Sequence, residues 1–259
     1  MQRGSSVEDA FREVARPVVA LGSDYADGHV IAPHRHRRDQ LLYGATGVVL
    51  LATAAGAWVM PPERGMWIPA GIVHDVRIMG RVRMRSLYIE PGVIRNMPGH
   101  CQVLGIPPLM RSLLAEAVFV PAEYDPAGRD GALMALIQHE IPLLPALPLS
   151  LPLPAHKALA GLCRSFLLAP TPHTSIDAWS EAAGCSRRTF TRLFRRETGL
   201  SFVAWRQQAC VMAALPRLAA GQPVTAVALD LGYDNPAAFT SMFRRILGTP
   251  PGAYIEREA

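Results

Sequence analysis

Two stretches of this chain, 49 residues apart, repeat one pattern of apolar, basic and helix-ending residues. Each copy reads as a short helix, a turn containing glycine, and a second helix, which predicts helix-turn-helix units at 175–199 and 224–248. The shift superimposes the following pairs: Phe190/Phe239, Phe194/Phe243, Arg195-Arg196/Arg244-Arg245, Gly199/Gly248 and Trp205/Tyr254. A fold for this part of the chain therefore has to contain the same unit twice.

The second helix of the first copy is amphipathic. Ser186 is placed to cap its start and Gly199 follows its end. Phe190 and Phe194 lie on one side of it, whereas the opposite side carries Arg188, Thr191, Arg192 and Arg195. In an isolated helix such a face is usually only solvated charge. Two copies joined by a helix favour DNA, because a helix of this kind fits the major groove.

Several short motifs resemble the DNA-binding domain of AraC/XylS-type transcription regulators over residues 156–256. They are Ala183-Gly184-Cys185-Ser186, Thr198-Gly199, Leu231-Gly232-Tyr233, Phe243-Arg244-Arg245 and Gly248-Thr249-Pro250-Pro251-Gly252-Ala253-Tyr254. The resemblance implies a sequence-specific transcription regulator that binds double-stranded DNA. Its two recognition helices would enter successive major grooves about 34 Å apart.

The resemblance also assigns roles within the first recognition helix. Base contacts fall to Arg188, Thr191 and Arg192, and phosphate contacts to Arg187, Arg195 and Arg196. An ion pair of Arg195 with Glu197 or Asp177 is an equally weighted alternative to its phosphate contact.

The second recognition helix departs from this pattern because its groove-facing side has no long donor. That side consists of Pro236, Ala237, Ala238, Thr240 and Ser241. We therefore expect the first unit to supply most base readout. The second unit should mainly anchor the protein, through Arg244, Arg245 and the helix N-terminus. Pro216, inside the helix that connects the units, is expected to kink or split that helix.

The first hundred residues have a different sequence pattern, in which short apolar runs alternate with turn-forming residues. Examples are 47–51, 57–60, 65–69 and 83–89. Such closely spaced strands predict an all-β barrel or sandwich. The fold class expected for the whole chain is thus two-domain: an N-terminal all-β cupin-like barrel plus helices, and a C-terminal all-α domain.

Histidines in this half are spaced so that they could meet inside a barrel. His34 and His36 would share one face of a strand, and a neighbouring strand could bring His74 beside them. Together with Gln40 their spacing resembles the two cupin motifs, although Gln40 stands where that family usually has Glu, and Ile78 where an Asn is common. Three interpretations stay open: a small-molecule pocket, a divalent metal site, and ordinary core or surface histidines.

Further expectations concern residues near this cluster. Arg35, Arg37 and Arg38 are expected to add positive potential, Trp58 and Trp67 to line the pocket or to belong to the core, and His29 to have no role.

The middle of the chain predicts two amphipathic helices, at 107–120 and 126–144, which pack on the barrel or form a dimer seam. A Pro-rich stretch follows and reads as an extended spacer. We therefore expect four segments: a cupin-like sensor domain at 1–100, a helical segment at 101–141, a linker at 142–154, and the DNA-binding domain at 155–259.

Composition limits the remaining choices. The chain has 259 residues, half of them hydrophobic, and a formal net charge of +5, which permits an anionic partner. Met1–Arg16 lacks the apolar core of a signal peptide, and no apolar run is long enough to span a membrane. The four cysteines lack CxxC spacing. They are expected to be reduced thiols of a cytoplasmic protein.

The favoured function is transcription regulation controlled by a small-molecule or metal effector bound near His34, His36, Gln40 and His74. A homodimer and RNA polymerase are further expected partners, and the one candidate cofactor is a divalent metal at the histidine cluster. The alternatives are a metal-dependent cupin dioxygenase or isomerase with an accessory helical domain, and a structural nucleic-acid binder. Two features argue against the cupin enzyme: Gln40 replaces the usual Glu ligand, and an enzyme gives no reason for the duplicated helix-turn-helix unit.

Overall fold

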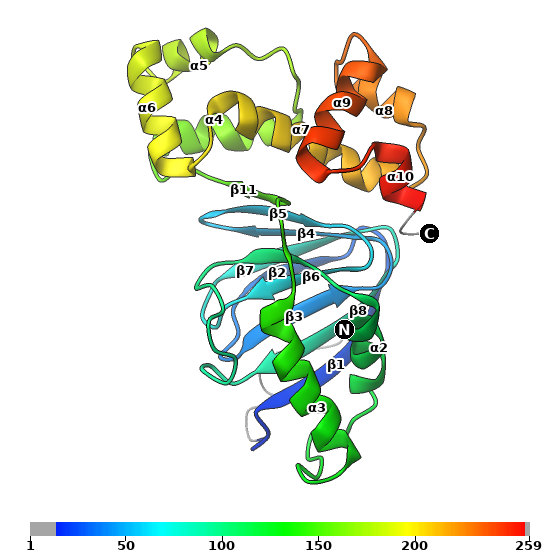
Figure 1. Ribbon diagram of the computed structural model, residues 1–259. Helices are drawn as coiled ribbons and strands as arrows, with labels where there is room; N and C mark the ends of the chain where they lie inside the picture. The colour runs from blue at the N-terminus through cyan, green and yellow to red at the C-terminus, as the bar shows by residue number, and fades with distance from the viewer. Residues whose placement is uncertain (1–13, 257–259) are drawn as a thin grey trace. The chain divides into compact units, whose positions relative to one another are not determined.

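The computed structural model describes residues 14–256 (Figure 1). We expected no signal peptide in Met1–Arg16, and residues 1–13 of that stretch lie outside the described part of the chain. The chain divides into two compact units. The first comprises the chain up to Leu51 and Met60–Leu147, and the second comprises Ala52–Val59 and the chain from Pro148 onward.

Two antiparallel sheets form the β-rich part of the chain, which confirms the expected all-β, cupin-like class. One sheet has the order β1 (Val18–Tyr25), β8 (Val82–Ile89), β3 (Asp39–Gly44), β6 (Arg64–Ile68), β9 (Gln102–Gly105) and β10 (Ala146–Leu147). The other has the order β11 (Ser150–Pro152), β5 (Gly56–Met60), β4 (Val48–Thr53), β7 (His74–Met79) and β2 (Val30–His34).

The strands β3 and β8 lie side by side and are buried on both faces. Leu41 and Leu87 are register partners and belong to the hydrophobic cluster on the outer face of the sheet. Their neighbours Leu42 and Ser86, also register partners, face the opposite way into a cavity. Because side chains alternate along a strand, one strand pair supplies both a packing surface and a wall of the cavity.

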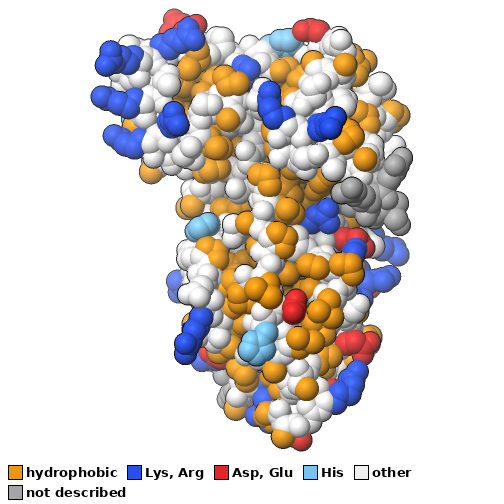
Figure 2. Space-filling view, in the orientation of Figure 1, with side chains coloured by type: hydrophobic (Ala, Val, Ile, Leu, Met, Phe, Trp, Pro, Cys, Tyr) orange, Lys and Arg blue, Asp and Glu red, His pale blue; other side chains and the backbone are white. Residues whose placement is uncertain are grey.

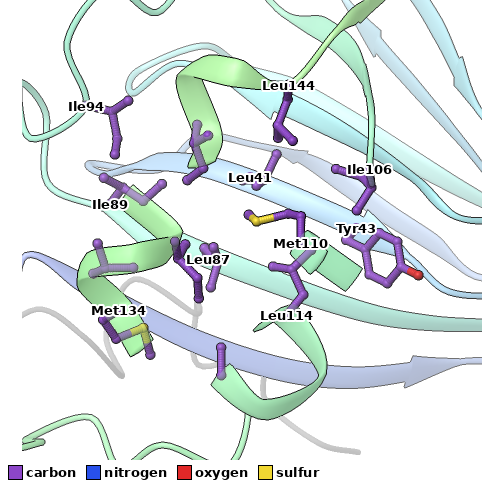
Figure 3. Packing of buried hydrophobic residues seen from close by; sticks show 14 of the residues in the cluster. Leu41, Tyr43, Leu87, Ile89, Ile94, Ile106, Met110, Leu114, Met134 and Leu144 are labelled. Carbon is purple, nitrogen blue, oxygen red and sulfur yellow. The ribbon is translucent and has the colours of Figure 1, made fainter. Parts of the chain in front are cut away.

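Helices α2 (Pro108–Ala117) and α3 (Arg129–Glu140) cover the outer face of this sheet (Figure 3). Met110 and Leu114 of α2 and Met134 of α3 are buried against Leu41, Leu87 and Ile89. Of the two roles expected for these helices, packing on the barrel is therefore the one observed within the chain.

The helical segment expected at 101–141 needs one correction. Its first residues form the strand β9, which pairs with β6 and brings Val103 opposite Met66. Val103 and Leu104 are adjacent and both buried, because helices cover one side of the sheet and β strands the other. Two adjacent buried apolar residues do not distinguish a strand from a helix in sequence.

The Pro-rich stretch 142–154 is mostly extended and contributes β10 and β11 to the ends of the two sheets. It begins in a single 3-10 turn at Ile141–Leu143. Edge positions suit this sequence, because a proline has no N–H to donate to a ladder. The division between the compact units falls within this stretch, after Leu147.

The described part of the second unit that follows the Pro-rich stretch contains seven helices and no strand, in agreement with the expected all-α domain. They are α4 (Lys157–Leu168), α5 (Ile176–Ala182), α6 (Arg187–Thr198), α7 (Phe202–Ala219), α8 (Val224–Asp230), α9 (Pro236–Leu247) and α10 (Pro251–Glu256). The pairs α5–α6 and α8–α9 are the two helix-turn-helix units. The turn at 231–235 is one residue longer than the turn at 183–186.

The duplication extends to the aromatic packing. Phe194 meets Trp205 edge to face, with ring centroids 5.8 Å apart and an interplanar angle of 88°. At the equivalent positions, Phe243 meets Tyr254 at 5.7 Å and 80°. Edge-to-face contact is a favourable geometry for aromatic pairs. The two copies of the repeat therefore share a packing interaction as well as a pattern of residue types.

We expected Pro216 to kink or split the connecting helix, and the structure shows that the helix is not split. The helix α7 runs without interruption from Phe202 to Ala219, and Pro216 lies in its last turn, fully packed. A proline there removes a single backbone hydrogen bond, while burial of Leu215 and Leu218 on either side holds the turn. Among the described helices, none combines the length and apolar character needed to cross a membrane.

Candidate functional site

A cavity of about 660 Å³ opens in the first unit, and all four residues of the predicted cluster line it. His34, His36, Gln40 and His74 come from β2, the loop after it, β3 and β7, so the fold brings them together as the spacing indicated. The remaining wall is formed by Leu21, Ser23, Tyr25, His29, Ile31, Ala32, Pro33, Arg35, Leu42, Val76, Met84, Ser86 and Tyr88.

The three imidazole rings are in mutual contact. His34 and His74 are register partners on β2 and β7, with ring centroids 4.3 Å apart. The ring of His36 lies 4.8 Å from that of His34 and 5.4 Å from that of His74. One detail of the prediction is wrong: β2 ends at His34, and His36 lies in the following loop rather than on the same strand face. The register of β2 against β7 shifts between Ile31 and His34, and the pair His34–His74 is the last of this ladder.

Backbone contacts define the tautomers of two of these rings. The Nδ1 atoms of His34 and His74 lie 2.9 Å from the carbonyl oxygens of Ala32 and Ile72. Because a carbonyl only accepts, each Nδ1 carries the proton, and in the neutral ring Nε2 offers a lone pair. Burial lowers the pKa of His36 to about 3 and also lowers the pKa of His74. Both rings are therefore neutral near pH 7.

Gln40 is oriented by hydrogen bonds inside the cavity. Its Nε2 donates to Ser86 Oγ at 3.1 Å and to Tyr88 Oη at 3.3 Å. Its Oε1 is buried and has no hydrogen-bond partner among the described residues. Since an unsatisfied buried acceptor costs free energy, this oxygen is a candidate contact for a ligand.

The positive potential expected beside the cluster is smaller than the sequence suggested. Arg37 and Arg38 each place an Nη2 atom 2.9 Å from Glu90 Oε1, so the Glu90 carboxylate offsets part of their positive charge. Arg35 alone of the three lines the cavity.

The aromatic lining also differs from the expectation. Trp67 belongs to the hydrophobic cluster on the outer face of the sheet, and Trp58 is buried away from the cavity wall. Tyr25, Tyr88 and His29 supply the aromatic lining instead. Met84, Ser86 and Tyr88 share one face of β8, but Ser86–Ile89 are buried on both faces, so no polar–apolar alternation marks Tyr88 in the sequence.

The helix α6 presents a continuous basic surface in the second unit, and basic side chains gather over this region in Figure 2. Arg187, Arg188, Thr191, Arg192, Arg195 and Arg196 line one shallow depression. On the opposite side of the helix Phe190 and Phe194 are fully buried. Ser186 caps the helix by accepting from the N–H of Thr189, and Gly199 ends it with φ of 74°.

Ion pairs divide these arginines into two groups. Arg187 lies 3.4 Å from Asp177, and Arg196 lies 3.3 Å from Glu197. Neither acid pairs with Arg195, although such a pair was the alternative to its phosphate contact. Arg188, Arg192 and Arg195 are exposed and have no ion-pair partner within the described part of the chain. Their guanidinium groups are therefore free to bind an anion.

The helix α9 is different in kind. Ala237, Ala238 and Ser241 are exposed and Thr240 is half-buried, which leaves a surface of short side chains. Arg245 donates to Gln207 at 2.8 Å, and Arg244 is exposed. The first N–H groups of the helix bond to Asn235, through its side chain and its carbonyl. These N–H groups at the start of α9 are thus bonded within the chain.

A chain that combines this cavity with two helix-turn-helix units has the design of a ligand-responsive DNA-binding regulator. A family described as AraC-like ligand binding domain matches residues 16–145, and one described as helix-turn-helix domain matches residues 179–257. The chain belongs to the AraC family of transcription regulators, and it is not an enzyme. It binds DNA and carries a ligand-binding domain.

Three known proteins are similar to it. The HTH-type transcriptional regulator NimR of Escherichia coli (strain K12) is 33% identical over 224 residues, covering 86% of this chain and 82% of NimR. The HTH-type transcriptional regulator RipA of Corynebacterium glutamicum is 34% identical over 105 residues, or 40% of this chain and 31% of RipA. A crystal structure of ToxT from Vibrio cholerae, with an unsaturated fatty acid bound, covers 92% of this chain and 94% of ToxT at 9% identity, with a TM-score of 0.38.

Proposed function

We propose that a small molecule bound in the cavity at His34, His36, Gln40 and His74 controls the affinity of this regulator for a specific DNA site. The observation that supports the proposal is the cavity itself: about 660 Å³, with an unpartnered buried oxygen on Gln40. A cavity of this size is typical of small-molecule sites. A coupling free energy of about 1–3 kcal/mol between the sites would change DNA affinity about 5–150-fold.

On the DNA side, the proposal divides the work between the two units. Arg188, Thr191 and Arg192 of α6 contact bases, while Arg187, Arg195 and Arg196 contact phosphates. Three observations support this: Arg188, Arg192 and Arg195 lack ion-pair partners, the basic surface is continuous, and no long donor lies on the exposed face of α9. The hydroxyl of Thr191 donates to the carbonyl of Arg187, which leaves its lone pairs and methyl group for a base.

A divalent metal is a second candidate for the ligand of the cavity. The residues fit one: His34, His36 and His74 each offer a ring nitrogen, and these atoms all lie within 4.8 Å of one another. The chemistry that a bound metal would supply here is an acceptor for electron pairs of a small molecule. His34 and His74 are already oriented for such a role by their Nδ1–H bonds to backbone carbonyls.

The proposal includes a homodimer that acts in the cytoplasm. Exposed apolar side chains on the helical segment, Leu109 and Leu136 among them, provide surface for a second copy. Light scattering on the full chain, with and without its DNA site, measures the oligomeric state. If the protein activates transcription it also contacts RNA polymerase, which transcription with purified polymerase would detect.

One experiment tests the central proposal. Purified full-length protein selects its sites from fragmented genomic DNA, and neighbouring genes suggest compounds to titrate against the selected DNA. We expect one compound to change the dissociation constant at least fivefold. The variant His34→Ala should lose that response and keep DNA binding, whereas the exposed control His100→Ala should keep both. A response that survives intact in His34→Ala would place the effector elsewhere.

A further inference from the structure

The turns of the two helix-turn-helix units have the same backbone design but different surroundings. After α5 the chain turns at Gly184, with φ of 65°, and after α8 it turns at Gly232, with φ of 87°. A Cβ added at Gly184 would meet nothing within 4 Å in the described chain. At Gly232 it would lie 3.1 Å from Thr171 Oγ1 and 3.6 Å from His173 Cδ2. The second turn is therefore covered by another segment of the chain, whereas the first is open.

The covering segment, residues 170–174, joins α4 to α5 and so leads directly into the first helix-turn-helix unit. The Nε2 of His173 forms a hydrogen bond with the carbonyl oxygen of Gly232 in the second unit. Because a carbonyl only accepts, this Nε2 carries the proton. The carbonyl of Thr174 accepts from Arg206 on the connecting helix α7. Prolines at positions 170 and 172 fix two backbone φ angles, which stiffens the segment.

Aromatic packing links this segment to both recognition helices. On one side, Trp179 of α5 packs against Phe190 of α6, with ring centroids 6.3 Å apart. On the other side, Tyr233, which follows the glycine of the second turn, packs against Phe239 of α9 at 5.4 Å. The hydrogen bond of His173 thus completes a series of contacts from α6 to α9 that is separate from the connection through α7.

A second connection matters because both recognition helices have to reach DNA together. When one helix binds, the other gains a high effective concentration only if the geometry lets both engage. Units that are held in the bound arrangement beforehand do not lose further freedom on binding, which increases affinity. A segment that restrains bending between the units therefore strengthens binding to a two-groove site and not to a single groove.

We propose that residues 170–174 form a brace that holds the two helix-turn-helix units in the arrangement in which both bind DNA at once, with His173 as the positioning residue. His173 acts through Gly232 and the second turn. The proposal rests on the proposed function, in which the second unit anchors the protein to DNA. The carboxylate of Asp234 also lies 3.9 Å from His173 Nε2, but it is 93% exposed. Such an exposed ion pair contributes little, so the bond to the carbonyl is the one that holds the brace.

The test uses the full chain and a DNA site selected from fragmented genomic DNA, on which footprinting locates the two contacted grooves. In a second duplex, about five base pairs, or half a helical turn, are inserted between these grooves. The two grooves then lie on opposite faces, so one unit binds at a time. For the wild-type protein we expect the insertion to weaken binding about tenfold or more.

His173→Ala should reduce this dependence on spacing. Its affinity for the original site should fall about fivefold, while its affinity for the inserted site should equal that of the wild type. The side chain is 58% exposed, so its replacement leaves the core intact. His173→Gln, which keeps an N–H donor, should restore the wild-type ratio of the two affinities. A loss of affinity in His173→Ala that is equal on both duplexes would overturn the proposal, because it would indicate a direct contact of His173 with DNA or general destabilisation.

Matched variants separate the brace from strain and from charge. Gly232→Ala and Gly184→Ala both place a side chain at positive φ, but only the first pushes against Thr171 and His173. Gly232→Ala should therefore lose spacing dependence and Gly184→Ala should keep it. Asp234→Asn removes only the neighbouring charge and should leave the ratio of affinities unchanged. Equal spacing dependence in the two glycine variants would contradict the brace.

Failure of this inference is distinguishable from failure of the proposed function. If the wild-type protein depends on spacing and His173→Ala depends on it equally, the second unit anchors as proposed and only the brace is wrong. If the wild-type protein binds both duplexes equally, the second unit does not anchor, and the proposed division of work is wrong together with the brace.

Discussion

The indole N–H of Trp205 donates a 2.8 Å hydrogen bond to the carbonyl oxygen of Pro152. Trp205 lies on α7 and is fully buried, while Pro152 ends β11. Gln208, one turn further along α7, donates to the carbonyl of Ser150. The carbonyl groups of β11 thus find side-chain donors on the helix within the same compact unit.

This contact makes a prediction about stability. Trp205→Phe removes the donor and should lower the free energy of unfolding of the second unit by about 1–3 kcal/mol, because the Pro152 carbonyl loses its partner. Trp58→Phe is the matched control in the same unit: its indole N–H is buried without a partner among the described residues. Urea denaturation compares the two variants, and a smaller loss for Trp205→Phe than for Trp58→Phe would contradict the prediction.

A second prediction concerns two glycines inside helices. At Gly131 in α3, an added Cβ would lie 2.1 Å from the carbonyl oxygen of Pro126, whereas at Gly161 in α4 nothing lies within 4 Å. Gly131→Ala should therefore destabilise the first unit by about 1–3 kcal/mol through overpacking. Gly161→Ala should stabilise the second unit by up to about 1 kcal/mol, as helix propensity alone predicts. Thermal unfolding of both variants checks the opposite signs, and equal signs would refute the argument.

The sequence predicted the second unit more fully than the first because its signals are local. Caps such as Ser186, ending glycines such as Gly199 and the spacing of Phe190 and Phe194 all lie within one helix, and the repeat confirmed each of them. The site in the first unit depends on contacts between distant strands. The spacing of His34 and His74 was informative, but their pairing requires the register of β2 against β7.

Residues with no pattern of their own were missed for the same reason. Tyr88 enters the cavity because β8 alternates between two buried faces, and a strand buried on both sides shows no alternation of polar and apolar letters. The sequence predicts added positive potential from Arg37 and Arg38, but Glu90, far along the chain, pairs with both. An ion pair between residues far apart in the sequence produces no local sequence pattern.

These two arginines give a third prediction. Both reach Glu90 Oε1 at 2.9 Å, but the side chain of Arg38 is 5% exposed and that of Arg37 is 60% exposed. Arg38 also donates to the carbonyl groups of Val14 and Arg16. Arg38→Ala should cost about 2–3 kcal/mol of stability, since hydrogen bonds to a charged group are lost in a buried place. Arg37→Ala should cost less than about 1 kcal/mol, as exposed ion pairs do.

The comparison of Arg37→Ala and Arg38→Ala is made by urea denaturation at low and high salt. Added salt should reduce the small effect of Arg37→Ala and leave the effect of Arg38→Ala nearly unchanged, because buried charges are poorly screened. Similar losses for the two variants would show that burial does not set the strength of these contacts.

The last prediction concerns base readout by the two recognition helices. Arg192 is exposed on α6 without an ion-pair partner in the described chain, while the corresponding residue of α9 is Ser241, which cannot bind a guanine through two hydrogen bonds. Arg192→Ala should cost about 1–3 kcal/mol on the preferred DNA site and relax the preference at one base pair. Ser241→Ala should change binding by less than about 1 kcal/mol.

Arg196, which we propose to contact a phosphate, provides the control for that experiment. Arg196 forms an ion pair with Glu197. The variant Arg196→Ala should weaken DNA binding by a similar factor on every DNA sequence, and should reduce the dependence of DNA affinity on salt. Fluorescence anisotropy on a panel of singly mutated sites measures all three variants. If Ser241→Ala relaxes the base preference more than Arg192→Ala does, then α9 is the main reader, and the unequal distribution of arginines between the two units has a different cause.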